Sequence, residues 1–175
     1  VVGHSAMANA TSATGNVAVG DNAGGGATNT ADNNVWIGNN AAYATTSGTS
    51  NVLIGYASGD ANTTGNNLVG IGYNTLSANT TASYNVAIGK DAGLVNTTGD
   101  GGVWIGYRSG VAHTTASQNT CVGLEAGAAI TTGNANTLFG YLAGDAISTG
   151  TNNVCLGPNA GGTATTATFL IAIGN

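Results

Sequence analysis

Two apolar residues separated by one position and closed by a glycine recur along the whole chain, as in Asn85-Val86-Ala87-Ile88-Gly89. The closing residue falls at Gly3, Gly20, Gly38, Gly55, Gly72, Gly89, Gly106, Gly123, Gly140, Gly157 and Gly174, 17 residues apart throughout except for 18 between Gly20 and Gly38. A fixed period over the whole chain predicts a stack of equivalent structural units.

The two apolar positions predict a short strand in every unit, since alternating β-branched residues are typical of a strand with one buried face. We expect these residues to fill the interior of each coil: Val52, Ile54, Val86, Ile88, Val103 and Ile105. A small residue and a further glycine follow the repeat glycine, and we expect a second short strand there. One unit is too short to bury a core, so parallel coils would stack roughly 4.8 Å apart. The sequence therefore predicts an all-β, parallel β-solenoid, a single repetitive domain over residues 1–175 with roughly ten coils.

The residue between the two apolar positions is also uncharged in every unit, and alternation places it on the opposite side of the strand. We predict that this column is an oligomer interface, because a strand that is apolar on both faces is usually covered on both. The column includes Trp36, Leu53, Ala87, Trp104, Cys121, Leu138 and Cys155. The alternative is a set of scattered exposed apolar residues.

A pair of hydroxyl residues occurs eight and nine positions after most of the repeat glycines. We predict a ladder of turn hydroxyls bonded to backbone, which includes Thr63, Thr64, Thr97, Thr98, Thr131 and Thr132. The alternative is a threonine array that orders water, as in ice-binding solenoids. Recurring tyrosines after the repeat glycine leave a similar choice between a stripe for sugars and a cover for the neighbouring coil, and we favour the cover.

The Asn-Val-Ala-Ile-Gly repeat resembles the YadA-like head repeat of trimeric autotransporter adhesins, and the Thr-Thr-Gly turn resembles repeats of bacteriophage tail fibres. The resemblance covers residues 1–175. It implies a left-handed β-roll with three chains around one axis and the middle strand residue facing that axis. The longer period and the two tryptophans, Trp36 and Trp104, depart from the family pattern. The family implies no ligand-binding residue.

Charge is scarce: 5% of the residues are charged, and 7 acids against 2 bases give a net charge of −5. Lys90 and Arg108 form no basic patch, so nucleic-acid binding is not expected. No apolar run is long enough to cross a membrane. Cys121 and Cys155 lie two coils apart, roughly 9.6 Å on this spacing, which is too far for an intrachain disulfide.

The sequence shows no group of residues that is typical of a catalytic or metal-binding site. His4 and His113 lie several repeats apart, and the acids occupy different repeat positions. We therefore expect no enzyme, no catalytic or metal-ligating residue and no cofactor, and ligand-binding residues stay unassigned.

The function that fits these patterns is a shaft or head segment of a trimeric extracellular fibre, on a cell surface or a virion, that attaches to a host or another surface. Both ends of the sequence interrupt a repeat, so we expect a fragment of a longer fibre protein. The expected partners are copies of the same chain, a trimer first, and a host-surface glycan or protein. An ice-binding solenoid is the alternative.

Overall fold

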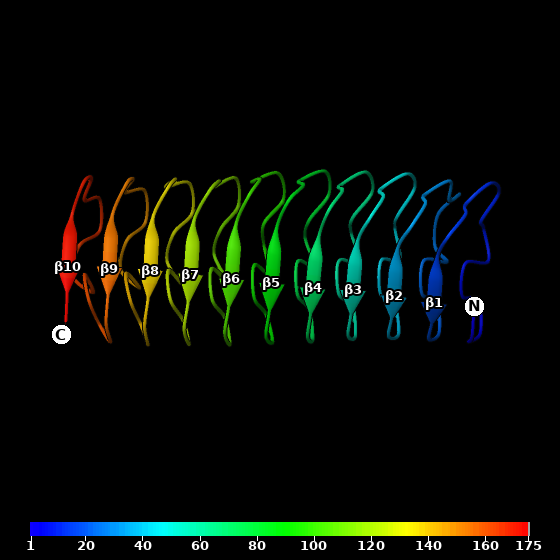
Figure 1. Ribbon diagram of the computed structural model, residues 1–175, viewed down its shortest axis with the longest axis horizontal. Coiled ribbons are helices and arrows are strands. Elements are labelled where there is room, and N and C mark those ends of the chain that lie inside the picture. Colours follow the sequence, from blue (N-terminus) through cyan, green and yellow to red (C-terminus); the bar gives the residue numbers. More distant parts are fainter. Residues whose placement is uncertain (175) are drawn as a thin grey trace.

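The computed structural model describes residues 1–174 and forms a straight rod of stacked coils with the two termini at opposite ends (Figure 1). The described residues contain no helix. One strand from each coil joins a parallel, ten-stranded sheet in sequence order. The predicted all-β, parallel β-solenoid with 17-residue coils is confirmed.

Each strand is three residues long. The strands are β1 (Val17–Val19), β2 (Val35–Ile37), β3 (Val52–Ile54), β4 (Val69–Ile71), β5 (Val86–Ile88), β6 (Val103–Ile105), β7 (Thr120–Val122), β8 (Thr137–Phe139), β9 (Val154–Leu156) and β10 (Ile171–Ile173). The register pairs equal repeat positions, as in Val52↔Val69 and Ile54↔Ile71. Every repeat position therefore forms a column along the rod.

The second strand expected in each coil does not form. After each repeat glycine the chain makes turns, and its backbone is left-handed two and four residues on, as at Asn74 (φ 54°) and Leu76 (φ 52°). Extended strands do not contain such residues. Successive coils still pair through their backbone in this part, since Leu76 N donates to Ala92 O at 3.1 Å.

The two faces of the strand are the reverse of the sequence-based prediction. Ala87 is fully buried inside the coil, whereas its neighbour Ile88 is 36% exposed. All seven residues predicted as an oligomer interface lie buried in the coil interior: Trp36, Leu53, Ala87, Trp104, Cys121, Leu138 and Cys155. The six predicted core residues lie on the outer side, partly buried or exposed: Val52, Ile54, Val86, Ile88, Val103 and Ile105. Both predictions were wrong for one reason: with apolar residues in both sets, alternation separates the faces without telling which one points inward.

The interior is filled by residues of complementary size. Trp104 lies against Gly93, where an added Cβ would be 2.6 Å from the indole Cε3. A Cβ added at Gly102 or Gly110 would lie even closer to the same ring. Glycines thus make room for the large side chain in a rod of constant width, as close packing requires.

Buried asparagines join the coils from inside. The Asn136 Oδ1 accepts hydrogen bonds from the backbone N (3.0 Å) and the Nδ2 (2.9 Å) of Asn153, one coil on. The Asn136 Nδ2 donates to Asn119 Oδ1 and to Gly150 O, both at 2.9 Å. A second column contains Asn62, Asn79 and Asn96. Because their amide groups are hydrogen-bonded, these buried polar residues do not carry the cost of unpaired ones.

The repeat glycine is required by the close approach of neighbouring coils. At Gly89 the φ angle is 122°, which residues with a side chain rarely adopt. A Cβ there would lie 2.7 Å from the carbonyl oxygen of Gly106. Along this column of glycines, the backbones of successive coils therefore lie in close contact.

Candidate functional site

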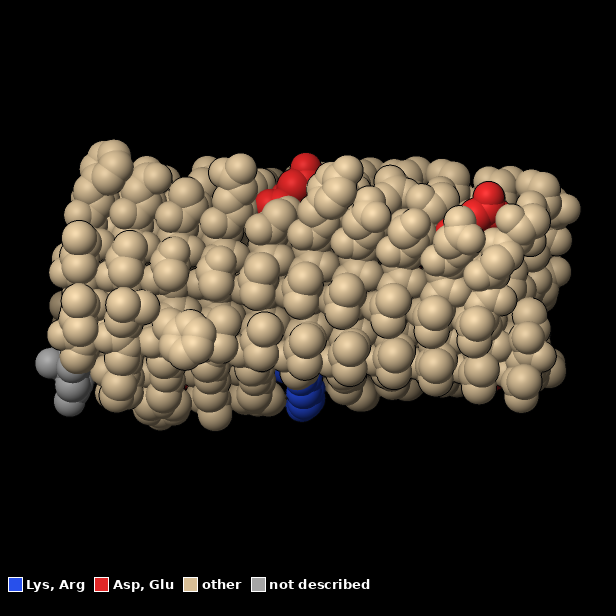
Figure 2. Space-filling view, viewed as in Figure 1, with Lys and Arg blue, Asp and Glu red and all other residues tan. Residues whose placement is uncertain are grey.

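The outer side of the sheet carries two columns of exposed or partly exposed apolar side chains, which we call the outer apolar face. The first and third residues of β1 to β10 form it, and they are Val or Ile in most strands. Ile71 is 38% exposed, Phe139 56% and Leu156 38%. The side of the rod in Figure 2 shows few charged groups. Soluble monomers rarely expose an apolar surface that runs along the whole molecule, so this face is a candidate interaction surface.

A column of tyrosines lies next to this face, one residue after the repeat glycine. The rings of Tyr56 and Tyr73 are stacked, with centroids 5.1 Å apart and planes 11° apart. The Lys90 Nζ lies 5.7 Å from the centroids of both Tyr73 and Tyr107. Neighbouring coils therefore cover ring faces that a stacked sugar would need, which favours the structural role of these tyrosines.

The hydroxyl ladder forms with the first residue of each pair. Thr63 Oγ1 donates to Thr80 O at 2.9 Å, Thr97 Oγ1 to Thr114 O at 3.0 Å, and Thr131 Oγ1 to Ser148 O at 3.3 Å. This part of the prediction is confirmed. The second residues, Thr64, Thr98 and Thr132, are exposed at the surface instead.

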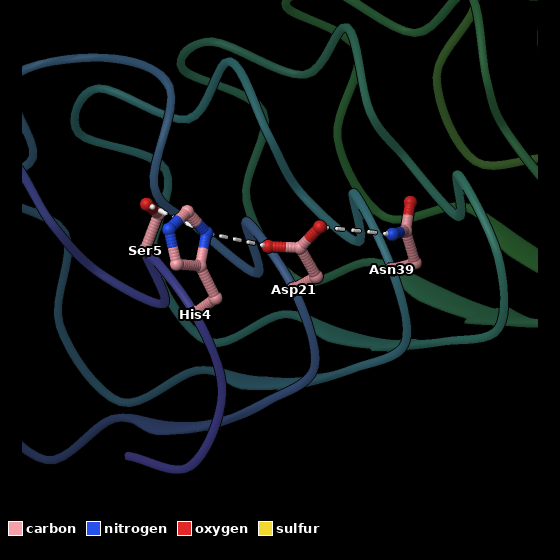
Figure 3. A network of polar contacts seen from close by, with 4 residues as sticks. All are labelled: His4, Ser5, Asp21 and Asn39. Carbon is pink, nitrogen blue, oxygen red and sulfur yellow. Dashed lines mark hydrogen bonds and ion pairs between the residues drawn. The ribbon is translucent and has the colours of Figure 1, made fainter.

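Near the N-terminus, a histidine, a serine and an aspartate meet in a way that invites comparison with a catalytic triad (Figure 3). The His4 Nδ1 lies 3.1 Å from Asp21 Oδ1 and 3.2 Å from Ser5 Oγ, and Asn39 Nδ2 donates to Asp21 Oδ2 at 3.4 Å. A triad needs the serine on one ring nitrogen and the carboxylate on the other. Here both contact the same nitrogen on an exposed ring, so the cluster lacks the geometry that activates a serine.

The second histidine is buried far from the first. Trp104 Nε1 donates to His113 Nδ1 at 2.8 Å. Burial lowers the pKa of His113 to about 3, and the Gly127 backbone partly opposes this shift. The His113 Nε2 has no hydrogen-bond partner among the described residues. His113 is therefore neutral at ordinary pH, and the structure does not bring it together with His4.

The cysteines are both free and buried, in agreement with the prediction that they form no intrachain disulfide. Burial raises the pKa of both thiols. Within residues 1–174, no three His, Cys, Asp or Glu side chains are grouped to hold a metal ion. The described part of the chain also has no helix of the length and apolarity that crossing a membrane requires.

A surface hollow was missed by the sequence analysis. It has a volume of about 620 Å³ and is lined by Tyr84, Asp100, Gly101, Thr115, Ser117, Gln118 and Asn134. The only signal for it in the sequence is the succession of a large aromatic residue, Tyr84, and a glycine, Gly101, at one repeat position.

Comparison with known proteins adds no assignment: no family model, no curated protein and no solved structure matches this chain.

Proposed function

We propose that this chain is a structural segment of an oligomeric fibre, in which copies of the chain bury the outer apolar face against one another. The observation that carries the proposal is the exposure of β-branched residues in register along the rod, such as Ile37 (37%), Ile71 (38%) and Ile88 (36%). Water contact costs roughly 25 cal/mol for every Å² of apolar surface, so a face of this length strongly favours association.

The surface that we assign to the oligomer is therefore not the column chosen from the sequence. Trp36, Leu53 and Ala87 are fully buried inside the coil. The flanking residues of each strand, such as Val86 and Ile88, take that place. Their uniform size suits an interface that repeats along the rod, whereas the inward column varies from glycine to tryptophan.

The architecture supports a mechanical role. Each coil is bonded to the next by backbone pairing and by buried asparagines, as between Asn136 and Asn153. A solenoid of this kind extends by adding equal units, so it makes a stiff spacer. The resemblance to YadA-like head repeats and to phage tail fibres supports three chains, an extracellular location and a part in attachment to a host or surface, and we include these in the proposal.

Two double variants that add the same charge to the same coils test the interface. Ile71→Lys with Ile88→Lys places two ammonium groups in the outer apolar face. Thr81→Lys with Thr98→Lys places them on exposed turns between the strands. In size-exclusion chromatography with light scattering, we expect the isoleucine variant to dissociate and the threonine variant to keep the mass of the unmodified chain. Equal masses for the two variants would contradict the proposal.

A second candidate function, ice binding, is favoured by one observation. The second hydroxyl of each pair is exposed in successive coils and forms a regular row: Ser47, Thr64, Thr81, Thr98, Thr115, Thr132, Thr149 and Thr166. Evenly spaced hydroxyls are able to order water. Thermal hysteresis that is lost in the Thr64→Tyr, Thr98→Tyr double variant would support this function, and its absence from the unmodified chain would exclude it.

A further inference from the structure

One column of surface residues changes in residue type from coil to coil. It lies two residues before the first residue of each strand. In the middle of the rod this column contains Asn67, Tyr84, Gly101 and Gln118. A Cβ added at Gly101 would meet only the Gln118 Cγ, at 3.8 Å, so the space above this glycine is open. An aromatic ring on one side and an amide on the other thus flank an open surface hollow of about 620 Å³, which lies within the size range of small-molecule sites.

Tyr84 does little for the stability of the rod. The residue is 67% exposed, and among residues 1–174 its ring stacks on no other aromatic ring. Its φ of 63° is a left-handed conformation that suits Asn and Gly much better than an aromatic residue. This conformation belongs to the whole column, as at Ser50 (φ 59°) and Gln118 (φ 60°), and the column is aromatic elsewhere only at Phe169 near its C-terminal end. An exposed aromatic side chain in the middle of the rod, where the neighbouring coils have small or polar residues, points to contact with another molecule.

The polar lining of the hollow is held in place by hydrogen bonds between coils. The Asp100 Oδ1 accepts from Ser83 N at 2.6 Å, and the backbone N of Asp100 donates to Ser117 Oγ at 3.1 Å. Ser117 N in turn donates to Asn134 Oδ1 at 2.7 Å. The Asp100 Oδ2 and the Ser117 hydroxyl hydrogen remain for a ligand. A fixed carboxylate beside an aromatic ring is able to accept hydrogen bonds from hydroxyls while the ring contacts an apolar face.

The charge of the hollow restricts the ligand. Neither Lys90 nor Arg108, the 2 bases of the sequence, lines it, and the chain carries a net charge of −5. Anionic ligands such as phosphates or acidic sugars are therefore repelled. One carboxylate alone is too little for a hard divalent cation, which takes six or more oxygen ligands. A neutral ring with an apolar face and several hydroxyls satisfies every part of the site.

We infer that the hollow bounded by Tyr84, Asp100 and Gln118 binds a neutral pyranose sugar, with the sugar ring against Tyr84 and two of its hydroxyls on Asp100. This goes beyond the mechanical role proposed above, because a spacer needs no ligand site, and it assigns a site and a ligand class to the proposed attachment. It supplies the fibre with a glycan contact on the shaft itself.

Saturation-transfer difference NMR on the full chain tests the inference, since this method detects weak binding to large assemblies. The probes are the methyl glycosides of galactose, mannose, glucose and N-acetylglucosamine, with N-acetylneuraminic acid as the anionic comparison. We expect signal transfer to at least one neutral glycoside and none to N-acetylneuraminic acid. Tyr84→Ser introduces the residue that Ser50 provides in the same column, and it should abolish the transfer. Asp100→Asn should reduce it at least threefold.

Tyr56→Ser is the matched control, because it removes another exposed tyrosine and should leave the transfer unchanged. Absence of transfer to all four neutral sugars would overturn the inference, and so would transfer that survives Tyr84→Ser. The result does not depend on the fibre: a monomeric chain that binds the sugar refutes only the proposed function, and a trimer that binds none refutes only the sugar site.

Discussion

Ala87 and Ile88 are neighbours in one strand, yet their side chains lie on opposite sides of the sheet. Ala87 is fully buried in the coil, and Ile88 lies on the outer apolar face at 36% exposure. The sequence shows both as apolar and so cannot order them by polarity. Size was the available signal: the inward column ranges from Gly70 to Trp104, because neighbouring interior positions compensate for each other, while the outward columns stay close to Val and Ile.

Gly89 should be far less tolerant of a methyl group than Gly101. In Gly89→Ala the new Cβ would lie 2.7 Å from Gly106 O, at a φ of 122°, so we expect a loss of about 2–4 kcal/mol in the free energy of unfolding. Gly101→Ala meets no backbone, and only its left-handed φ of 67° opposes the change, at a cost of about 1–2 kcal/mol. Urea denaturation followed by circular dichroism measures both. Equal losses would show that the coils do not approach each other at the repeat glycine.

Cys121 tests the inward assignment of the middle strand residue directly. Its thiol is fully buried, and burial raises its pKa, so little of the reactive thiolate forms. We expect a maleimide to label Cys121 only as fast as the chain unfolds. Val122→Cys with Cys121→Ala carries the thiol on the outer face. It should be labelled much faster in the Ile71→Lys, Ile88→Lys background, where we expect the chains to dissociate. Rapid labelling of native Cys121 in the folded chain would place the column on the outside after all.

For the strands and turns, the columns of equal repeat positions explain which features could be predicted from the sequence and which could not. The strands follow from the alternation of residues such as Val52 and Ile54, and both the period and the parallel register follow from their constant spacing. The second strand was expected because the turn segment also repeats small residues such as Ala92. Residues with a left-handed backbone, such as Asn74 and Leu76, make this segment a turn instead. These backbone angles are visible in the structure but not in the residue types.

His113 replaces an asparagine in the column of Asn62, Asn79 and Asn96, and this substitution should make the rod sensitive to acid. Burial lowers the pKa of His113 from 6.5 to about 3. Below pH 6.5 the unfolded chain binds a proton that the folded chain does not. Above pH 6.5 the neutral His113 costs no stability. As the pH drops from 6.5 toward 3, the free energy of unfolding decreases, by at most about 5 kcal/mol in total.

His113→Asn restores the residue type of that column and is the matched control. It should remove this dependence on pH between 6.5 and 3, while His4 stays in place in both proteins. Thermal melts at a series of pH values measure the effect. A melting temperature that falls equally in both proteins over this range would show that His113 is not the group responsible.

At the scale of the whole molecule, a solenoid with one strand in each coil leaves one side of its sheet uncovered. Residues such as Ile71 and Phe139 on that side are exposed in the single chain, whereas the interior is already filled by residues such as Leu53 and Trp104. The fold thus completes its own core and presents a second apolar surface of the same length. The sugar-binding hollow belongs to another column and interrupts the repeat only locally.

The mass of the unmodified chain in solution tests the central claim most directly. Burial of the outer apolar face between copies predicts a stable assembly, and three chains predict three times the 16.8 kDa mass of one chain. Sedimentation equilibrium at protein concentrations of about 1–50 µM covers the range in which a specific oligomer persists. A mass of three chains that holds on dilution is the expected result. A single species of 16.8 kDa over the whole range would contradict the account.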